Sequence, residues 1–207
     1  MEAPTPASAL IHSSTLVIMG IYLIVRFSIF FEFTVTANFL MAVLGSLTIA
    51  LGATAATFQN DIKKLVAYST VSQMGYLFCG CGFMAYNEVM FYLFAHAINK
   101  AFLFILVGYT VHFYLGNTDL RFMGLASAYK LDLLFYFIIV SINLTGLPLS
   151  AGFVAKESLL FHTLKQGLIF DLVRSLWVVS FVLTPIYMLM LNMAAFWFYA
   201  KAPFTLF

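Results

Sequence analysis

Apolar residues run along this chain in stretches of about 20, separated by short polar clusters. A helix of that length is long enough to cross the hydrocarbon core of a bilayer. The clusters carry most of the charges and turn-forming residues, as in Gln59-Asn60-Asp61. The pattern predicts six transmembrane helices, over about residues 8–26, 36–57, 64–84, 89–115, 132–164 and 174–199.

The composition supports a surface that faces lipid. Hydrophobic residues make up 63% of the 207 and charged residues only 9%, whereas about a quarter of a soluble domain is charged. The 24 phenylalanines also suit an exterior in contact with phospholipid. We therefore expect an all-α, polytopic membrane bundle that forms a single domain over residues 1–207. The net charge of +2 gives no indication of nucleic-acid binding.

The stretch over 132–164 is too long for one plain crossing and is interrupted by Gly146, Pro148 and Gly152. Proline breaks the helical hydrogen bonding, and glycine tolerates unwound backbone. Lys156 and Glu157 follow the break within about one helical turn. A simple proline kink would explain the break, but ionisable residues beside it favour a discontinuous helix with an ion site, as in many transporters.

The stretch over 89–115 contains ionisable residues at helical spacing. Tyr92, His96 and Lys100 stand at i, i+4 and i+8, on one face of a helix and over about 12 Å of its length. Lys100 is far from both ends, and an ammonium at that depth costs about 3 kcal/mol to insert. These residues, with His12 as a further candidate, suggest a proton relay.

Two cysteines, Cys79 and Cys81, lie in an apolar stretch at i, i+2, so their thiols point apart on a helix. We expect them to be packing residues, without a disulfide or a metal. The sequence has no cysteine cluster framework and no glycine-rich nucleotide motif. We therefore expect no cofactor on this chain.

Five segments carry a family resemblance, and they read MEAPTPASALIHSSTLVIMGIYLIVRF, NDIKKLVAYSTVSQMGYLF, HAINKAFLFILVGYTVH, DLRFMGL and LTGLPLSAGFVAKESL. In this order they resemble segments of the largest antiporter-like subunit of respiratory NADH:ubiquinone oxidoreductase, complex I. The similarity runs from residue 1 to about residue 160. It implies one repeat of the antiporter-like fold and a proton-translocating function in the membrane arm of that enzyme.

The resemblance also implies the relay residues. The matching positions are His12, Lys63, His96, Lys100, Lys156 and Glu157. Glu157 stands where the family commonly has aspartate, and Tyr92 stands where many relatives have a second histidine. Redox catalysis, with FMN, iron–sulfur clusters and ubiquinone, is then expected on other subunits of the assembly.

The implied partners are the other membrane-arm subunits of complex I. The family protein has a preceding repeat, so we expect a separately encoded N-terminal-half fragment as a further partner. The expected location is the mitochondrial inner membrane, with a bacterial plasma membrane as the alternative.

Two other functions remain open from the sequence. One is a subunit of a multisubunit sodium/proton antiporter, and the other is a pump-derived structural subunit without conduction. Lys100 and Lys156 argue against the second, because a scaffold gains nothing from buried ammonium groups.

Overall fold

The computed structural model describes residues 5–13, 15–124, 131–164 and 171–197. Its helices are α1 (Thr5–Ser13), α2 (Leu16–Arg26), α3 (Ser28–Glu32), α4 (Val35–Thr57), α5 (Ile62–Gly82), α6 (Tyr86–Phe113), the 3-10 turn η1 (Leu120–Phe122), α8 (Leu131–Thr145), α9 (Ala151–Leu164) and α10 (Asp171–Phe196). The described regular structure is helical, apart from one isolated β-bridge between two loops. The prediction of an all-α bundle with a discontinuous helix is confirmed.

Where the sequence predicted one helix over 8–26, the structure has α1 and α2, with Thr15 in a bend between them. The hydroxyl of Thr15 donates to the carbonyl of Leu10 at 3.0 Å, and that of Ser13 donates to the carbonyl of Ala9 at 2.5 Å. Such side-chain bonds compete with the backbone bonds of a helix. The predicted end of the last helix at 199 lies outside the described residues.

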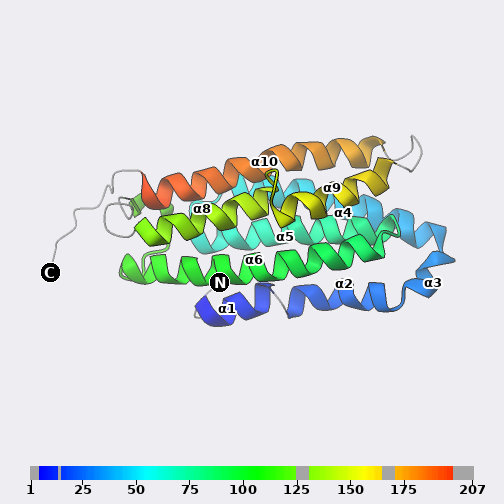
Figure 1. Ribbon diagram of the computed structural model, residues 1–207, viewed down its shortest axis with the longest axis horizontal. Helices are drawn as coiled ribbons and strands as arrows, with labels where there is room; N and C mark the ends of the chain where they lie inside the picture. The colour runs from blue at the N-terminus through cyan, green and yellow to red at the C-terminus, as the bar shows by residue number, and fades with distance from the viewer. Residues whose placement is uncertain (1–4, 14, 125–130, 165–170, 198–207) are drawn as a thin grey trace.

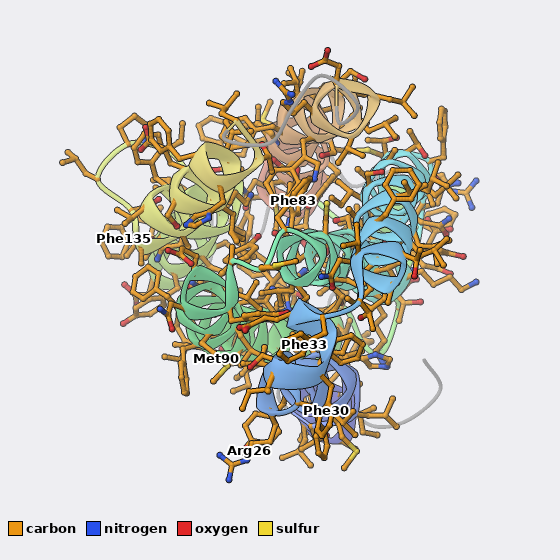
Figure 2. The ribbon with its side chains drawn as sticks, turned by 90° about the vertical axis from the view of Figure 1, so that its right-hand side faces the viewer. Arg26, Phe30, Phe33, Phe83, Met90 and Phe135 are labelled. Atoms are coloured by element: carbon orange, nitrogen blue, oxygen red, sulfur yellow. The ribbon has the colours of Figure 1, made fainter. Side chains whose placement is uncertain are left out.

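The long helices run side by side along the longest axis of the molecule (Figure 1). Figure 2 looks along the bundle and shows α5 at its centre, with α4, α6, α10 and the α2–α3 segment around it. Phe83 lies at the end of this central helix, whereas Arg26 and Phe30 lie on the outside. Most side chains of α5 therefore meet protein, whereas Lys64, Tyr68 and Val71 are exposed.

Four helical stretches among the described residues are long and apolar enough to cross a membrane: Thr5–Arg26, Val35–Thr57, Tyr86–Phe113 and Asp171–Phe196. The central α5 has 21 residues, about 31 Å of helix, but it carries buried polar side chains such as Ser69 and Gln73. The shorter α8 and α9 run one after the other in the same direction, so that the two together extend along the bundle as one long helix does (Figure 1).

Small residues let α4 approach α5 closely. A Cβ atom on Gly45 would lie 2.6 Å from the backbone nitrogen of Cys79, and one on Gly82 would lie 2.5 Å from that of Ala42. Helices inside membranes often pack through such small residues, because apolar burial gives no advantage over lipid there. This contact fixes α5 in the bundle.

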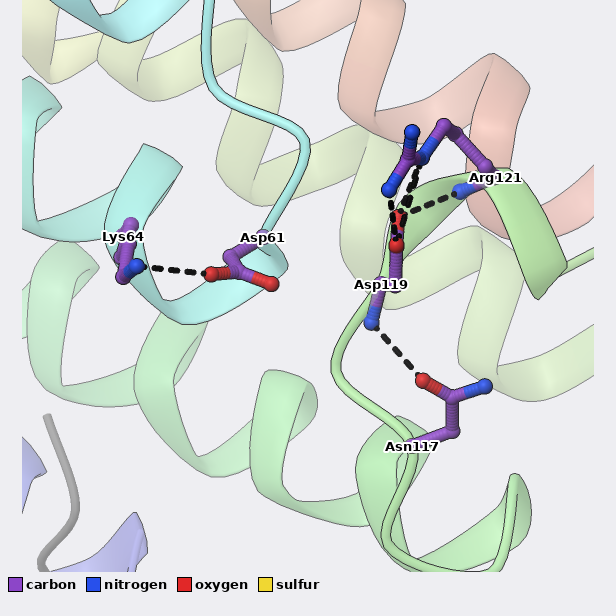
Figure 3. Close-up of polar contacts among 5 residues, drawn as sticks. All are labelled: Asp61, Lys64, Asn117, Asp119 and Arg121. Atoms are coloured by element: carbon purple, nitrogen blue, oxygen red, sulfur yellow. Dashed lines mark hydrogen bonds and ion pairs between the residues drawn. The ribbon is translucent and has the colours of Figure 1, made fainter.

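One end of the bundle is closed by an antiparallel bridge between Asp61, before α5, and Asp119, after α6 (Figure 3). Lys64 pairs with Asp61 at 3.1 Å, and Arg121 pairs with Asp119 at 2.6 Å. The hydrogen bond from Arg121 lowers the pKa of the Asp119 carboxyl. The bridge holds the adjacent ends of α5 and α6 together through backbone hydrogen bonds from Ile62 to Thr118 and from Leu120 to Asn60, whereas each ion pair lies within one segment.

A side-chain hydrogen bond ties the discontinuous helix to α6 near the other end of the bundle. Nε2 of His162, in the last turn of α9, lies 3.1 Å from Oε1 of Glu88, in the first turn of α6. Both side chains are about one-third exposed. The end of α9 is thereby held against the start of α6.

The contact between α4 and α5 generates a stability prediction with a matched control. We expect Gly45→Ala to destabilise the folded protein by about 1–3 kcal/mol, because the added methyl overlaps the backbone at Cys79. Gly20→Ala, in α2, has no neighbouring atom within 4 Å and should gain helix propensity of up to about 1 kcal/mol. Thermal unfolding of the detergent-purified assembly measures both. Equal melting temperatures for the two variants would contradict the close-packing explanation.

Candidate functional site

The break between α8 and α9 leaves a backbone acceptor that Lys156 uses. In an uninterrupted helix the carbonyl of Leu144 would accept from the N–H of residue 148, but Pro148 has no N–H. Nζ of Lys156 lies 2.6 Å from the Leu144 oxygen and 3.4 Å from the Thr145 oxygen. The break therefore supplies acceptors, and the lysine supplies the donor.

Two glycines allow this geometry. Gly146 has φ +77°, and a Cβ atom there would lie 3.3 Å from Cδ of Lys156. A Cβ atom on Gly152 would lie 1.8 Å from the carbonyl oxygen of Asn143, so the first turn of α9 rests against the last turn of α8. Gly146, Pro148 and Gly152 together build the break that the sequence predicted.

The predicted ladder on α6 is buried throughout. Tyr92 is 3% exposed, His96 1% and Lys100 0%, and all three lie on the side of α6 that meets protein. Lys156, on α9, is 3% exposed. The structure therefore gathers two lysines and a histidine, each of them able to bind a proton, in the interior of the bundle.

Lys100 is held by α5. Its ammonium donates to the hydroxyl of Ser69 and to the carbonyl of Val66, the latter at 3.3 Å. Buried charge is tolerated when hydrogen-bonded partners replace water. Ser69 and Val66 provide that replacement.

Tyr92 takes part in a bridge across three helices. Its hydroxyl donates to Oε1 of Gln73 on α5, and Nε2 of Gln73 donates to the hydroxyl of Tyr187 on α10 at 3.4 Å. The three side chains are each at most 3% exposed. The hydroxyl of Tyr92 is therefore bonded toward α5.

His96 lies between Tyr92 and Lys100 on the ladder. Neither of its ring nitrogens has a hydrogen-bond partner within the described part of the chain. It lies close enough to Lys100 and Lys156 to interact with both electrostatically. A buried imidazole of this kind is available to exchange protons with water or with a neighbouring amine.

Lys156 also borders a pocket of about 240 Å³ between α9 and α10, whose lining is largely apolar. Its Nζ lies 5.6 Å from the ring centroids of Tyr76 and Phe181, within cation–π range. The hydroxyl of Tyr76 shares a hydrogen bond with Ser180 of α10. Glu157, half-buried, lines the same pocket.

The two remaining predicted site residues lie at the margins. The His12 ring, on α1, stacks on Phe104, with centroids 6.0 Å apart and planes 26° apart. Phe104 is one turn beyond Lys100, so His12 meets α6 where the ladder ends. Lys63 is half-buried in the first turn of α5, before Ser69. The roles of His12 and Lys63 stay predictions.

The residues that hold the ladder were not predicted from the sequence. Ser69, Gln73 and Tyr76 stand at i, i+4 and i+7 and thus share a face of α5. That spacing of polar residues in an apolar helix was the available signal. Ser180 and Tyr187 gave no comparable signal, because their partners on α5 are set only by tertiary packing.

The two cysteines are separate buried thiols on α5. Sγ of Cys79 lies 3.4 Å from the carbonyl oxygen of Ala42 and accepts from Nε1 of Trp177 at 3.2 Å. No group of three or more His, Cys, Asp or Glu side chains among the described residues gathers as a metal site.

Known proteins place the chain in a family. Residues 1–200 match the sequence model of a family of transmembrane proteins that is described as NADH:quinone oxidoreductase/Mrp antiporter. The chain is 50% identical over 190 residues to NADH-ubiquinone oxidoreductase chain 5 of Nyctotherus ovalis. The aligned residues make up 91% of this chain and 10% of that protein. It is 38% identical over 197 residues to NADH-quinone oxidoreductase subunit L of Rickettsia bellii. This alignment covers 95% of this chain and 30% of that protein.

A solved Mrp complex from Dietzia sp. has the same fold. One of its chains superposes with a TM-score of 0.85 at 27% identity, covering 95% of this chain and 37% of that one. This chain thus spans well under half the length of these relatives. The resemblance seen in the sequence is confirmed: the chain belongs to the NADH:quinone oxidoreductase/Mrp antiporter family of transmembrane proteins.

Proposed function

We propose that this chain is part of the proton-translocating membrane arm of an NADH:ubiquinone oxidoreductase. The observation that carries the proposal is the buried group of His96, Lys100 and Lys156, with hydrogen-bonding side chains between α5, α6 and α10. The similarity to NADH-ubiquinone oxidoreductase chain 5 supports the assignment of the enzyme.

Buried ammonium groups favour conduction over a purely structural role. Each one costs about 3 kcal/mol to insert on translocon scales, so its presence at depth points to a function. A structural subunit would be as stable, or more so, with apolar side chains of similar volume. Lys100 and Lys156 are both held by carbonyl or hydroxyl oxygens, which lowers this cost without removing it.

The mechanism that we infer is electrostatic. A proton on Lys100 repels one on Lys156, because the two amines interact through a medium of low dielectric constant. Loss of a proton from one amine therefore favours protonation of the other. His96, which interacts with both, is placed to pass protons between them through water.

Within the enzyme, we assign no redox step to this chain. Hydride and electron transfer through FMN, iron–sulfur clusters and ubiquinone would take place on other subunits. The chain would contribute to the reaction by coupling it to proton movement.

The partners that we propose are other membrane-arm subunits of the same enzyme, in a mitochondrial inner membrane and in contact with phospholipid. The separately encoded N-terminal-half fragment stays a prediction. Peptide mass spectrometry of the purified assembly tests it.

The similarity to a chain of an Mrp complex supports a second candidate function, sodium/proton antiport. The chain-5 and subunit-L relatives, at 50% and 38% identity, favour the oxidoreductase. The two functions differ in whether sodium is a transported ion.

The first functional prediction concerns the lysines. We expect Lys100→Ala or Lys156→Ala to slow proton pumping coupled to quinone reduction by about tenfold or more, because each removes a positioned proton carrier. The assembly should still form with Lys100→Ala, since this substitution also removes an insertion cost. Lys156→Ala should in addition lower the stability of the assembly, because it leaves the carbonyl of Leu144 without its donor. Pumping by the enzyme in proteoliposomes is the measurement, and Lys64→Ala, on an exposed lysine, is the control. If Lys100→Ala and Lys156→Ala both pumped protons at the parental rate, the relay would be refuted.

The second prediction concerns Tyr92. Tyr92→Phe removes the hydroxyl bonded to Gln73 and should slow pumping about threefold, whereas Tyr92→His should be tolerated, because imidazole can also donate to Oε1 of Gln73. The same proteoliposome assay measures both. If the Phe variant pumps like the parent, Tyr92 serves only in packing.

The third prediction separates the two candidate functions. Replacing sodium with potassium in the proteoliposome assay should leave proton pumping unchanged if the chain belongs to the oxidoreductase. Radioactive sodium uptake measured in parallel should remain at the level of empty vesicles. A sodium requirement for proton movement would favour the antiporter instead.

A further inference from the structure

Gln73 occupies an unusual place for a carboxamide. It is 1% exposed, near the middle of α5, between tyrosine hydroxyls on two other helices. Its oxygen accepts from Tyr92, and its nitrogen donates to Tyr187 at 3.4 Å. A carboxamide oxygen only accepts and its nitrogen only donates, so each of these bonds has one direction.

These two bonds lead across the bundle to a third helix, because Tyr187 lies on α10. The phenol oxygen of Tyr187 accepts from Nε2 of Gln73. A phenol is a weak acid, so Tyr187 is a poor proton carrier at the far end of this series.

This direction matters for His96, one turn along α6 from Tyr92. Tyr92 has a single hydroxyl proton, and Gln73 accepts it, so Tyr92 offers His96 only lone pairs. A hydroxyl turned toward the histidine would instead donate to a ring nitrogen and occupy it. Both ring nitrogens of His96 lack a hydrogen-bond partner among the residues described.

We propose that Gln73 is a positioning residue that holds the Tyr92 hydroxyl away from His96. It also prevents protons from leaving the relay along a side branch toward α10. A carboxamide is neutral and does not exchange protons between its oxygen and its nitrogen at neutral pH. It therefore links α5, α6 and α10 without conducting. The inference rests on the proposed function of His96 and Lys100 as a relay.

The test is a double-mutant cycle on the whole enzyme in proteoliposomes. Gln73→Leu removes both hydrogen bonds and frees the Tyr92 hydroxyl to donate to His96. We expect pumping to fall by about threefold in the parental background and to show no further fall when Tyr92→Phe is already present. A role of Gln73 that does not act through the Tyr92 hydroxyl would instead lower pumping by the same factor in both backgrounds, and that result would overturn the proposal.

The control for lost buried hydrogen bonds is Thr110→Val. Thr110 is fully buried on α6 and donates only to the carbonyl of Val107 in its own helix, at 2.8 Å. We expect parental pumping in this variant. A loss as large as that in Gln73→Leu would show that any buried polar deletion has this effect, which would also overturn the proposal.

A second variant keeps the test decisive if Gln73→Leu does not assemble. Gln73→Glu preserves shape and the acceptor for Tyr92 but adds a protonatable group between Tyr92 and Tyr187. We expect normal assembly, a lower ratio of protons pumped to electrons transferred, and a dependence of this ratio on pH that the parent lacks. A ratio equal to the parental one at every pH would overturn the proposal.

The two proposals fail in different ways. If Lys100→Ala pumps normally, the relay itself is absent. If Lys100→Ala abolishes pumping while the Gln73 variants behave as structural lesions, the relay stands and only the role of Gln73 is wrong.

Discussion

The hydrogen bonds from Lys156 to the carbonyl end of α8 are the interaction on which the rest of this structure depends. Hydrocarbon offers no donor to a backbone oxygen, so a helix can stop at membrane depth only where protein or enclosed water replaces the missing bond. Pro148 removes the donor that Leu144 would have had, and the ammonium of Lys156 replaces it. The lysine and the break therefore stabilise each other, and neither fits the membrane well alone.

The central position of α5 follows from the same constraint. Ser69, Gln73 and Tyr76 would be costly in contact with lipid, and the bundle buries them against α6 and α10. Close packing at Gly45 and Gly82 fixes the opposite side of α5 against α4. A helix of only moderate hydropathy thereby becomes the support for the ionisable residues.

Polar groups within this interior differ in what they can do with a proton. The amines of Lys100 and Lys156 and the imidazole of His96 bind and release protons, whereas the amide of Gln73 only directs hydrogen bonds. Placing a neutral amide between Tyr92 and Tyr187 joins three helices without adding another site of protonation. A relay needs such boundaries as well as carriers, because an open branch would dissipate the coupling.

The sequence by itself determined the fold class, the discontinuous helix and the burial of the ladder on α6. These features are local: the length of an apolar run, a proline between glycines, and the spacing of Tyr92, His96 and Lys100 follow from helix geometry and the cost of charge in lipid. Only the tertiary structure decided that Lys156 bonds to Leu144 and that Tyr92 bonds to Gln73 rather than to His96. It also decided that Tyr187, more than 100 residues away in sequence from Gln73, completes the bridge. Such pairings depend on how the helices rotate and approach one another, which the spacing of residues within a single helix does not specify.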